Sequence, residues 1–252
     1  GKILWTENGE GDKVHAFSGM DEHEEVNFIL DKVASLREKG EVSLKDMVIF
    51  YRIHALSRVF EEGLRRRGIP YGIIGGVGFY ERREVKDALA YLRAISCPSD
   101  SISLKRILNV PARGIGLTTL NMLQDLANAG NIPLAEAMAQ ALAAGKLARK
   151  QGEGIAKLLK LMEKGAAHRE ELGITGTLSW VLEASGYAAE LRAENTIEAR
   201  TRLENLKELS SATEEFESEF PNAKLEDFLA DIALWTDLDR YEDTTEKFTL
   251  MS

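Results

Sequence analysis

Cysteine is almost absent from this sequence of 252 residues, and long apolar runs are missing. The single cysteine, Cys97, excludes an internal disulfide bond, and no cluster of cysteine and histidine has the spacing of a zinc site. No apolar run approaches the roughly 20 residues that a membrane helix needs. Residues 1–5 lack the apolar segment of a signal peptide. These absences favour a protein of the reducing cytoplasm with no membrane partner.

Several catalytic motifs are also missing. The sequence has no G-x-x-x-x-G-K-[ST] loop to cradle a phosphate, and no predicted strand ends in paired carboxylates that would bind magnesium. The G-x-S-x-G and H-E-x-x-H motifs of two hydrolase classes do not occur. The histidines are scattered, as expected of surface residues, at His15, His23, His54 and His168. We therefore predict no metal site and no complete ATP-hydrolysing site in this chain.

The charge balance is acidic, although 44% of the residues are hydrophobic and can form a sizeable core. The formal net charge of −9 argues against a protein whose whole surface binds nucleic acid. The charge is uneven, because ten lysine and arginine residues stand against six acidic residues between Phe60 and Leu120, an excess of +4. Two interpretations of this segment remain open: solvated helix faces, or a strip that faces phosphate groups.

The first hundred residues alternate between strand-like and helix-like segments. The spacing of apolar residues predicts helices at 21–39, 55–67 and 84–95. Short apolar runs predict strands at 13–18, 71–74 and 46–51, and the last of these should be buried. Strands that alternate with helices of this length are typical of β-α-β units on a parallel sheet. Three strands are few for such a domain, so the predicted sheet is unfinished.

Cys97–Asp100 interrupts this alternation, and the rest of the chain is almost entirely helix-like. Alanine and leucine dominate there, which predicts helices at 103–108, 117–129, 133–144, 152–172, 176–185, 187–192, 196–217 and 224–234. Acidic, polar stretches predict loops at 216–222 and 237–246. The final apolar run, 248–251, is expected to be a strand, the alternative being an ordinary disordered tail. The predicted fold class is mixed: a partial, three-layer RecA-like α/β region with a parallel sheet, followed by an all-α domain.

Tyr51 and Arg52 lie where the predicted strand 46–51 ends and a loop begins. Proteins of the α/β class bind ligands at the carboxyl edge of their parallel strands. An arginine at this edge can reach a terminal phosphate, and an aromatic ring can stack on a base. The alternative is a surface arginine beside a core tyrosine.

A glycine-rich turn, Gly114-Ile115-Gly116, separates two predicted helices. Glycine lets the backbone approach a phosphate closely, and free N–H groups at a helix N-terminus bind anions. Thr118 and Thr119 lie in the first turn of the following helix, and Arg113 adds a positive charge. Such a hairpin can hold the backbone of a duplex without recognising its sequence. The alternative is a tight turn between helices with an ordinary cap.

Four segments occur in one order that resembles the superfamily 1 DNA helicases of the UvrD/Rep/PcrA type. Ile49–Arg58 resembles motif IV of that family, and Gly75–Asp87 looks like the next motif. Asn109–Gly116 and Thr196–Leu209 match two further motifs. Leu4–Gly9 is similar to the beginning of the family's second motor half. The resemblance covers nearly the whole chain, and the ordered set is far more specific than any one motif.

The resemblance implies a layout, because these helicases have two RecA-like motor domains, 1A and 2A, with inserted domains 1B and 2B. Residues 1–98 correspond to part of 2A, residues 99–240 to the all-α 2B insertion, and residues 241–252 to a strand returning toward 2A. The phosphate-binding motifs belong to 1A, so this fragment is expected to be inactive alone and to hold no cofactor. The full-length enzyme is expected to use ATP and Mg²⁺ and to move 3′ to 5′ on DNA that contains a junction of single strand and duplex.

The resemblance also implies roles for single residues. Tyr51 is expected against the adenine, and Arg52 is expected to contact the γ-phosphate as the catalytic arginine. The residues expected on duplex DNA are Arg113, Gly114, Ile115, Gly116 and Thr118, and those expected to face single-stranded DNA are Arg106 and Asn109. Structural contacts that join 2A to 2B are expected of Arg82, Glu84, Asp87, Arg202, Glu204 and Asn205. One departure is Ile53-His54, where relatives often carry Thr-Asn; it leaves Tyr51 and Arg52 unaffected.

Two other functions remain open. The chain can be a helical module that binds a protein partner, or inhibits a motor, without contacting nucleotide. It can also be the DNA-binding part of a repair nuclease that shares this helicase core. Salt-dependent binding to a junction of duplex and single strand separates the first alternative from a helicase.

Overall fold

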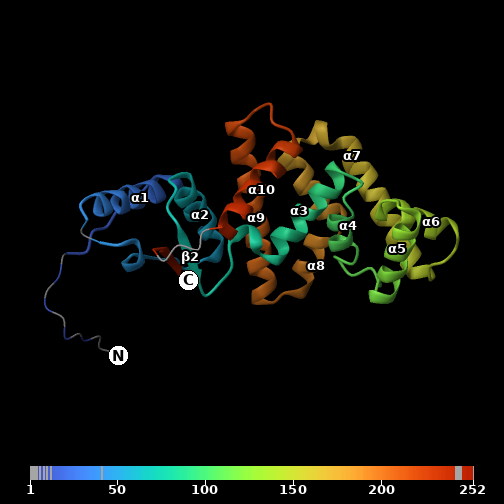
Figure 1. Ribbon diagram of the computed structural model, residues 1–252, viewed down its shortest axis with the longest axis horizontal. Coiled ribbons are helices and arrows are strands. Elements are labelled where there is room, and N and C mark those ends of the chain that lie inside the picture. The colour runs from blue at the N-terminus through green and yellow to red at the C-terminus, as the bar shows by residue number, and fades with distance from the viewer. Residues whose placement is uncertain are drawn as a thin grey trace.

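The computed structural model describes residues 13–40, 42–241 and 246–251, together with 5, 7, 9 and 11; within these ranges the side chains of residue 54 and residues 235–241 are not described. Half of Leu4–Gly9, which resembles the beginning of a motor half, lies outside the described residues, namely Leu4, Thr6 and Asn8. A small sheet region and a larger helical region lie side by side along the long axis of the molecule (Figure 1). No helix in the described part of the chain is both long enough and apolar enough to cross a membrane.

The sheet has three parallel strands in the order β1-β3-β2, namely Val48–Phe50, Phe248–Met251 and Tyr71–Ile74. Leu250 of the central strand is paired with Ile49 on one side and with Ile73 on the other. Phe248 and Leu250 are almost fully buried. The predicted parallel sheet and the predicted final strand are therefore confirmed, and the last described residues close a sheet that begins 200 residues earlier.

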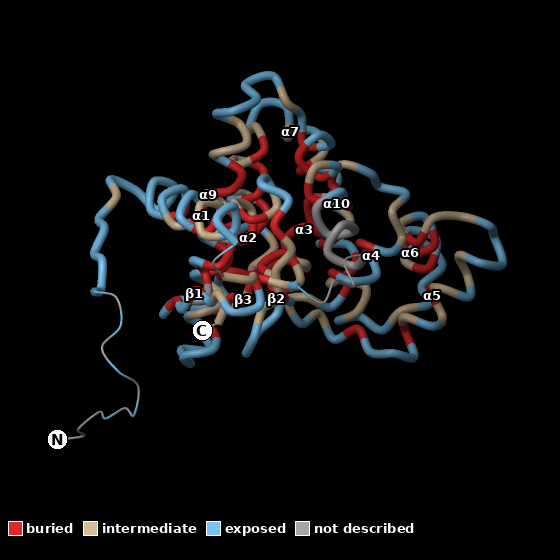
Figure 2. Tube along the Cα trace, turned by 60° about the vertical axis from the view of Figure 1, so that its left-hand side comes forward, coloured by how far each residue is buried: buried red, intermediate tan, exposed pale blue. Residues whose placement is uncertain are grey.

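Two helices cover one face of this sheet (Figure 2). Helix α1, Glu22–Glu38, begins where Asp21 accepts a hydrogen bond of 2.8 Å from the N–H of Glu24. Helix α2, Ser57–Arg66, follows the 3₁₀ turn η2, His54–Leu56. The core of the sheet region consists mainly of Val26, Leu30, Val33, Ile49, Val59, Leu64, Phe248 and Leu250.

The other face of the sheet is open within the described residues. Phe50 is 71% exposed and Ile74 is 53% exposed, whereas Ile49, which precedes Phe50 in β1, is buried. The prediction that 46–51 is a buried strand is therefore wrong for its outward side chains, because successive residues of a strand point to opposite faces. The described residues contain one helical layer of the expected three-layer arrangement.

The strand predicted at 13–18 is not formed. These residues have no regular secondary structure, and Val14 is almost fully exposed. The ring of Phe17 stacks on that of Phe28 in α1, with 4.0 Å between the ring centroids. An alternating pattern makes a strand only when a neighbouring strand offers hydrogen-bonding partners. Here the segment packs one aromatic ring on a helix instead.

The helical region contains η3, Phe79–Glu81, and eight helices in chain order. These helices are α3 Arg83–Ser96, α4 Ser101–Ile107, α5 Leu117–Gly130, α6 Leu134–Ala143, α7 Arg149–Ala184, α8 Tyr187–Glu194, α9 Ile197–Glu219 and α10 Leu225–Tyr241. Helix α3 lies at the centre and contacts α4, α7, α9 and α10 (Figure 1). Its apolar side chains belong to the helical core rather than to the core of the sheet region. The all-α expectation for this part of the chain is confirmed.

Three helix boundaries differ from the prediction. Helix α7 runs through both predicted segments, although Gly173 breaks its geometry with a φ of 69°. Helix α9 continues to Glu219 and α10 to Tyr241, where the acidic composition predicted loops, and residues 242–245 lie outside the described residues. The ring of Phe216 packs on that of Phe228 at 5.3 Å, and this packing holds the end of α9 in helical form.

Candidate nucleotide and nucleic-acid sites

Tyr51 and Arg52 follow β1 at the carboxyl edge of the sheet. The N–H of Tyr51 donates a hydrogen bond of 3.0 Å to the carbonyl of Met251, so the backbone here is fixed by the central strand. Tyr51 is 8% exposed, whereas Arg52 is exposed. Burial, and then the negative charge of Glu61, raise the pKa of the Tyr51 hydroxyl. The pair therefore presents one cation outward from a buried aromatic anchor.

A polar cluster lies beneath this anchor. Glu61 is 1% exposed and accepts hydrogen bonds from the hydroxyl of Ser57 at 2.7 Å and from the N–H of Phe79 at 3.1 Å. Burial raises the pKa of the Glu61 carboxyl, although Ser57 and nearby arginines oppose the shift. Arg82 donates to the same Ser57 hydroxyl at 2.7 Å. The anchor of Tyr51 is thus held by α2 and by the segment that leads into the helical region.

The same cluster joins the two regions. Arg82 donates to Asn205 of α9 at 2.7 Å, and Asn205 donates to Glu84 at 2.5 Å. The joining role predicted for Arg82, Glu84 and Asn205 is therefore confirmed. Arg202, by contrast, pairs with Glu194 at 3.6 Å inside the helical region, so the same expectation is wrong for it.

Asp87 and Glu204 differ in this respect. Asp87, which belongs to residues 1–98, accepts hydrogen bonds from Arg106 at 2.8 Å and from the Tyr187 hydroxyl at 3.3 Å, both in residues 99–240, so its contacts agree with the predicted joining role. Glu204 is exposed on α9. Fewer residues therefore join the two regions than the sequence suggested.

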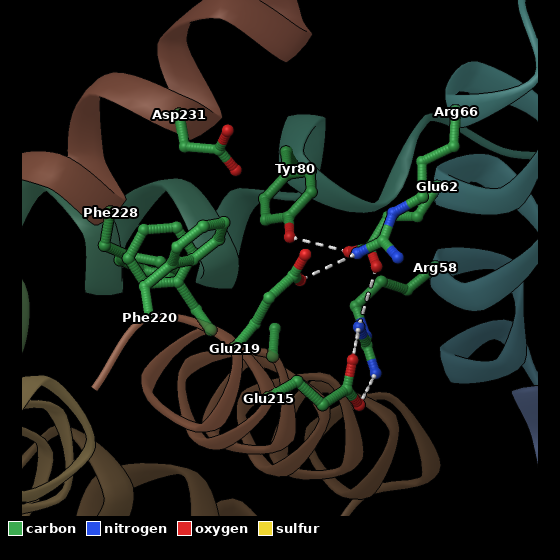
Figure 3. A pocket seen from close by; sticks show the side chains of 11 residues that line it. Arg58, Glu62, Arg66, Tyr80, Glu215, Glu219, Phe220, Phe228 and Asp231 are labelled. Carbon is green, nitrogen blue, oxygen red and sulfur yellow. Dashed lines mark hydrogen bonds and ion pairs between the residues drawn. The ribbon is translucent and has the colours of Figure 1, made fainter. Parts of the chain in front are cut away.

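A second joint, which the sequence did not indicate, is centred on Arg58 (Figure 3). This arginine of α2 is 1% exposed and donates to Glu62 at 3.0 Å, to Glu208 at 2.6 Å and to Glu215 at 2.7 Å. The Tyr80 hydroxyl donates to Glu62 at 2.9 Å. The neighbouring cavity is lined largely by acidic and aromatic side chains. Acidic walls repel phosphate, so this cavity is a structural joint rather than a nucleotide site.

The glycine-rich turn is built as predicted from the sequence, but with one side chain inward. Gly114 has a φ of 73°, a conformation that favours glycine, and Gly116 precedes the first turn of α5. Ile115 is buried in the helical core, while Thr118 is exposed. Asn109 accepts hydrogen bonds from the N–H groups of Arg113 at 2.7 Å and Ile115 at 3.2 Å. The turn is therefore rigid and presents mainly backbone outward.

Arg113 makes several hydrogen bonds within the chain. Its guanidinium donates to the carbonyls of Ile107 and Val110, both at 2.8 Å, and to the hydroxyl of Tyr91 at 2.7 Å. It therefore satisfies carbonyls at the end of α4 and shapes the turn, and its contact with DNA stays a prediction. Arg106 is likewise held by Asp87.

The basic excess between Phe60 and Leu120 is largely neutralised by acidic residues of the same chain. Most of its cations are paired within the chain, as Arg65 with Glu61, Arg66 with Glu219, Arg67 with Asp31, Arg83 with Asp87, Lys86 with Glu81, and Arg106 with Asp87. This pairing favours the interpretation as solvated helix faces over a strip that faces phosphate groups. Among the described residues, no group of three or more His, Cys, Asp or Glu side chains is arranged to hold a metal ion.

Comparison with known proteins agrees with this architecture. The family described as "UvrD-like helicase C-terminal domain" matches residues 1–252. The ATP-dependent DNA helicase PcrA of Bacillus subtilis (strain 168) is 38% identical over 246 residues, which are 98% of this chain and 33% of the relative. The proteins of the same name from Leuconostoc citreum and Staphylococcus aureus (strain Mu50 / ATCC 700699) are 36% and 38% identical over 100% of this chain and 34% of each relative. The chain spans about a third of the length of these curated relatives. It belongs to the family of UvrD-like helicase C-terminal domains.

Proposed function

We propose that this chain is the 2A and 2B part of an ATP-dependent 3′ to 5′ DNA helicase. It supplies one wall of an ATP site and a duplex-binding turn to an enzyme whose phosphate-binding loop lies in motor domain 1A of the same protein. Residues 1–98 and 241–252 form the 2A part, and residues 99–240 form the 2B insertion. Family membership and the relatives named as ATP-dependent DNA helicases support this proposal.

The exposed Arg52 at the carboxyl edge of the parallel sheet carries the proposal. A guanidinium presented from this edge matches a phosphate in charge and geometry. In the intact enzyme it contacts the γ-phosphate of ATP across the cleft to domain 1A, and Mg²⁺ is bound mainly from that other side. Tyr51 is buried and offers little ring surface to a base, so we assign it the role of anchoring Arg52.

The turn around Gly114 supports a contact with DNA. The first N–H groups of α5 lack partners within the helix, and such groups bind phosphate oxygens. Gly114, Gly116 and Thr118 are exposed beside them. The proposed contact is made through backbone and hydroxyl groups, and Asn109 and Arg113 hold the turn in shape.

Replacing Arg52 by alanine in the full-length protein tests the proposal. Loss of an arginine that neutralises the transferred phosphoryl group is expected to lower DNA-stimulated ATP turnover by ~10³- to 10⁵-fold. The melting temperature should stay unchanged, because Arg52 is exposed. Arg66→Ala, another exposed arginine of the sheet region, is the matched control and should keep normal turnover.

Near-normal ATP turnover in the Arg52→Ala protein refutes the assignment. That result favours the other candidate, a helical module that binds a protein partner and never contacts nucleotide. Arg52→Lys sharpens the test, since a lysine keeps the charge but not the planar fork of donors.

A further inference from the structure

A hollow lies at the turn between α9 and α10. Helix α9 ends at Glu219, and Pro221 cannot continue it because proline has no N–H to donate. The ring of Phe216 packs on the rings of Phe220 and Phe228, with centroid distances of 5.1 and 5.3 Å. Phe228 is buried, whereas Phe220 is 49% exposed and forms part of the wall of the hollow. Packed aromatic rings therefore fix the shape of this surface.

This hollow combines an apolar floor with an acidic rim. We call it the α9–α10 groove; its lining includes the apolar residues Phe216, Phe220 and Leu234 and the acidic residues Glu219, Asp227 and Asp231. Leu234, on α10, is 68% exposed. The groove has a volume of about 660 Å³, which lies in the range of ligand pockets. An exposed leucine beside a half-exposed phenylalanine in such a groove marks a surface that a binding partner can cover.

The charge around the α9–α10 groove has a single sign. Residues 214–231 contain seven glutamate and aspartate residues and one lysine, a local net charge of −6. None of the described residues that line the groove is a lysine or an arginine. Arg66 approaches from one side, but its pair with Glu219, at 3.5 Å, joins two side chains that are both more than half exposed. Such a pair is weak, so the rim keeps most of its negative charge.

Asp231 is the acidic residue of this rim that the chain leaves unpaired. Within the part of the chain that the structure describes, its carboxylate has no hydrogen-bond or ion-pair partner. It borders both the groove and the neighbouring cavity, beside Tyr80 and Glu219 (Figure 3). Glu215, in contrast, is held by Arg58 at 2.7 Å. A negative charge without a counter-charge is therefore placed at the edge of an apolar surface.

The chemistry of the groove selects the class of its occupant. Acidic walls repel the phosphate backbone of nucleic acid. Among the described residues, no three His, Cys, Asp or Glu side chains are arranged to hold a metal ion, so a bare metal cation does not fit either. An arginine fits, because its guanidinium pairs with carboxylates and stacks on aromatic rings. Arginine and aromatic residues are also enriched at the centres of protein–protein interfaces.

We propose that the α9–α10 groove binds a basic segment of a partner protein in which an arginine stands beside an apolar side chain. The arginine pairs with Asp231 and Glu219, and the apolar side chain covers Leu234 and Phe220. Charge complementarity between the acidic rim and a basic segment carries this choice of occupant. The interaction goes beyond the proposed contacts with ATP and DNA and uses none of the residues assigned to them.

The test measures binding of a short fluorescein-labelled peptide, in which arginine alternates with leucine, to the full-length protein. Fluorescence polarisation is recorded without DNA or ATP. The triple variant Glu219→Gln, Asp227→Asn, Asp231→Asn should bind the peptide about tenfold or more weakly, because hydrogen bonds to charged groups are lost. The fold should persist, since asparagine at position 227 can still accept the hydrogen bond from the N–H of Lys224.

A matched control replaces three exposed glutamates elsewhere, Glu38, Glu163 and Glu198, by glutamine. This variant loses the same total charge and should bind the peptide nearly as the parent does. Equal losses in the two triple variants would show a general charge effect and overturn the proposal. Unchanged affinity in the groove variant, with a normal melting temperature, would overturn it as well.

A second variant tests the apolar contact. Leu234→Gln should lower the affinity about tenfold, the factor that corresponds to covering a leucine side chain. Ile102→Gln replaces an apolar residue of α4 that is 84% exposed and should leave the affinity unchanged. Both variants should keep the melting temperature of the parent, because both side chains are exposed. Equal affinity of the Leu234→Gln and Ile102→Gln proteins would remove the apolar floor from the proposed site and overturn it.

Two probes separate a peptide site from simple attraction of cations. A peptide with serine in place of leucine should bind the parent protein about tenfold more weakly. Spermidine should compete poorly at the same concentration of positive charge, because it offers little to the apolar floor. Equal competition by spermidine would overturn the assignment to a protein segment. None of these outcomes bears on the proposed function, because the assay contains neither nucleotide nor DNA.

Discussion

Arg58 offers the most direct test of how the sheet region is fixed to the helical region. Replacement by alanine removes a fully buried cation and leaves the carboxylates of Glu62, Glu208 and Glu215 close together without their counter-charge. Removing one partner of a buried ion pair costs roughly 3 to 5 kcal/mol. Glu215 is 36% exposed, so water compensates part of the loss, and we expect about 3 kcal/mol. For a chain of this size that loss lowers the melting temperature by about 6 to 12 °C.

Chemical unfolding followed by circular dichroism measures this effect. Arg66→Ala is the control, because Arg66 and its partner Glu219 are both more than half exposed and such a pair contributes about 1 kcal/mol or less. A cycle with Glu215→Ala should give a coupling free energy above about 1 kcal/mol. A loss below about 1 kcal/mol for Arg58→Ala, or additive effects in the cycle, would refute the role of Arg58 as a joint.

The same joint predicts a dependence on pH. Burial opposes ionisation of Glu215, but the hydrogen bond and the charge of Arg58 outweigh it and hold the pKa of this carboxyl below its ordinary value of 4.5. A carboxyl whose pKa is lower in the folded state stabilises the protein at pH values above its ordinary pKa. This contribution is lost as the pH falls through the folded-state pKa. The stability difference between the parent and Arg58→Ala should therefore shrink below about pH 4.5. A difference that grows in acid would contradict the assignment.

Two further substitutions test local packing. Gly63→Ala places a Cβ atom 2.8 Å from Val26, so overpacking between α1 and α2 should cost about 1 to 3 kcal/mol in urea unfolding, although alanine favours helix. Gly152→Ala in α7 meets nothing closer than 3.5 Å and should be neutral or stabilise by up to about 1 kcal/mol; equal effects at both sites would contradict the packing argument. Arg113→Ala should cost about 1 to 3 kcal/mol by leaving the carbonyls at the end of α4 unsatisfied, and Arg113→Lys should recover little of it. A full recovery with lysine would show that charge rather than the planar donor set matters.

Local patterns predicted the helices well and the strands less well. Helical spacing located α1, α2 and α3 to within a few residues, because an amphipathic helix records its buried face in its own sequence. A strand depends on a partner elsewhere in the chain. The segment 13–18 has a strand-like pattern but forms no strand, whereas 248–251 becomes the central strand because β1 and β2 leave room for it.

The candidate sites also divide into features that local sequence predicts and features that depend on residues elsewhere in the chain. The position of Arg52 at a strand end and the turn at Gly114 follow from local sequence, and both are exposed in the structure. The inward role of Arg113 depends on carbonyl groups at the end of another element, which no local pattern reveals. The pairing of cations between residues 60 and 120 likewise depends on acidic residues of other elements, as Arg66 with Glu219 and Arg67 with Asp31 show. Counting charges along a chain does not show which of them are neutralised across the fold.

The central position of β3 has a consequence for how the molecule must assemble. The neighbouring strands β2 and β3 are separated in the chain by the whole helical region, from Ile74 to Phe248. Bringing the ends of so long a flexible loop together costs about 4 to 5 kcal/mol in entropy. Once folded, the helical region removes most of that cost, because α10 packs against α3 and η3 and so holds its outgoing end near its incoming one. The folded helical region thus restores the proximity of β2 and β3 that its length would otherwise remove, and loosening α10 should release β3, the middle strand, from the sheet.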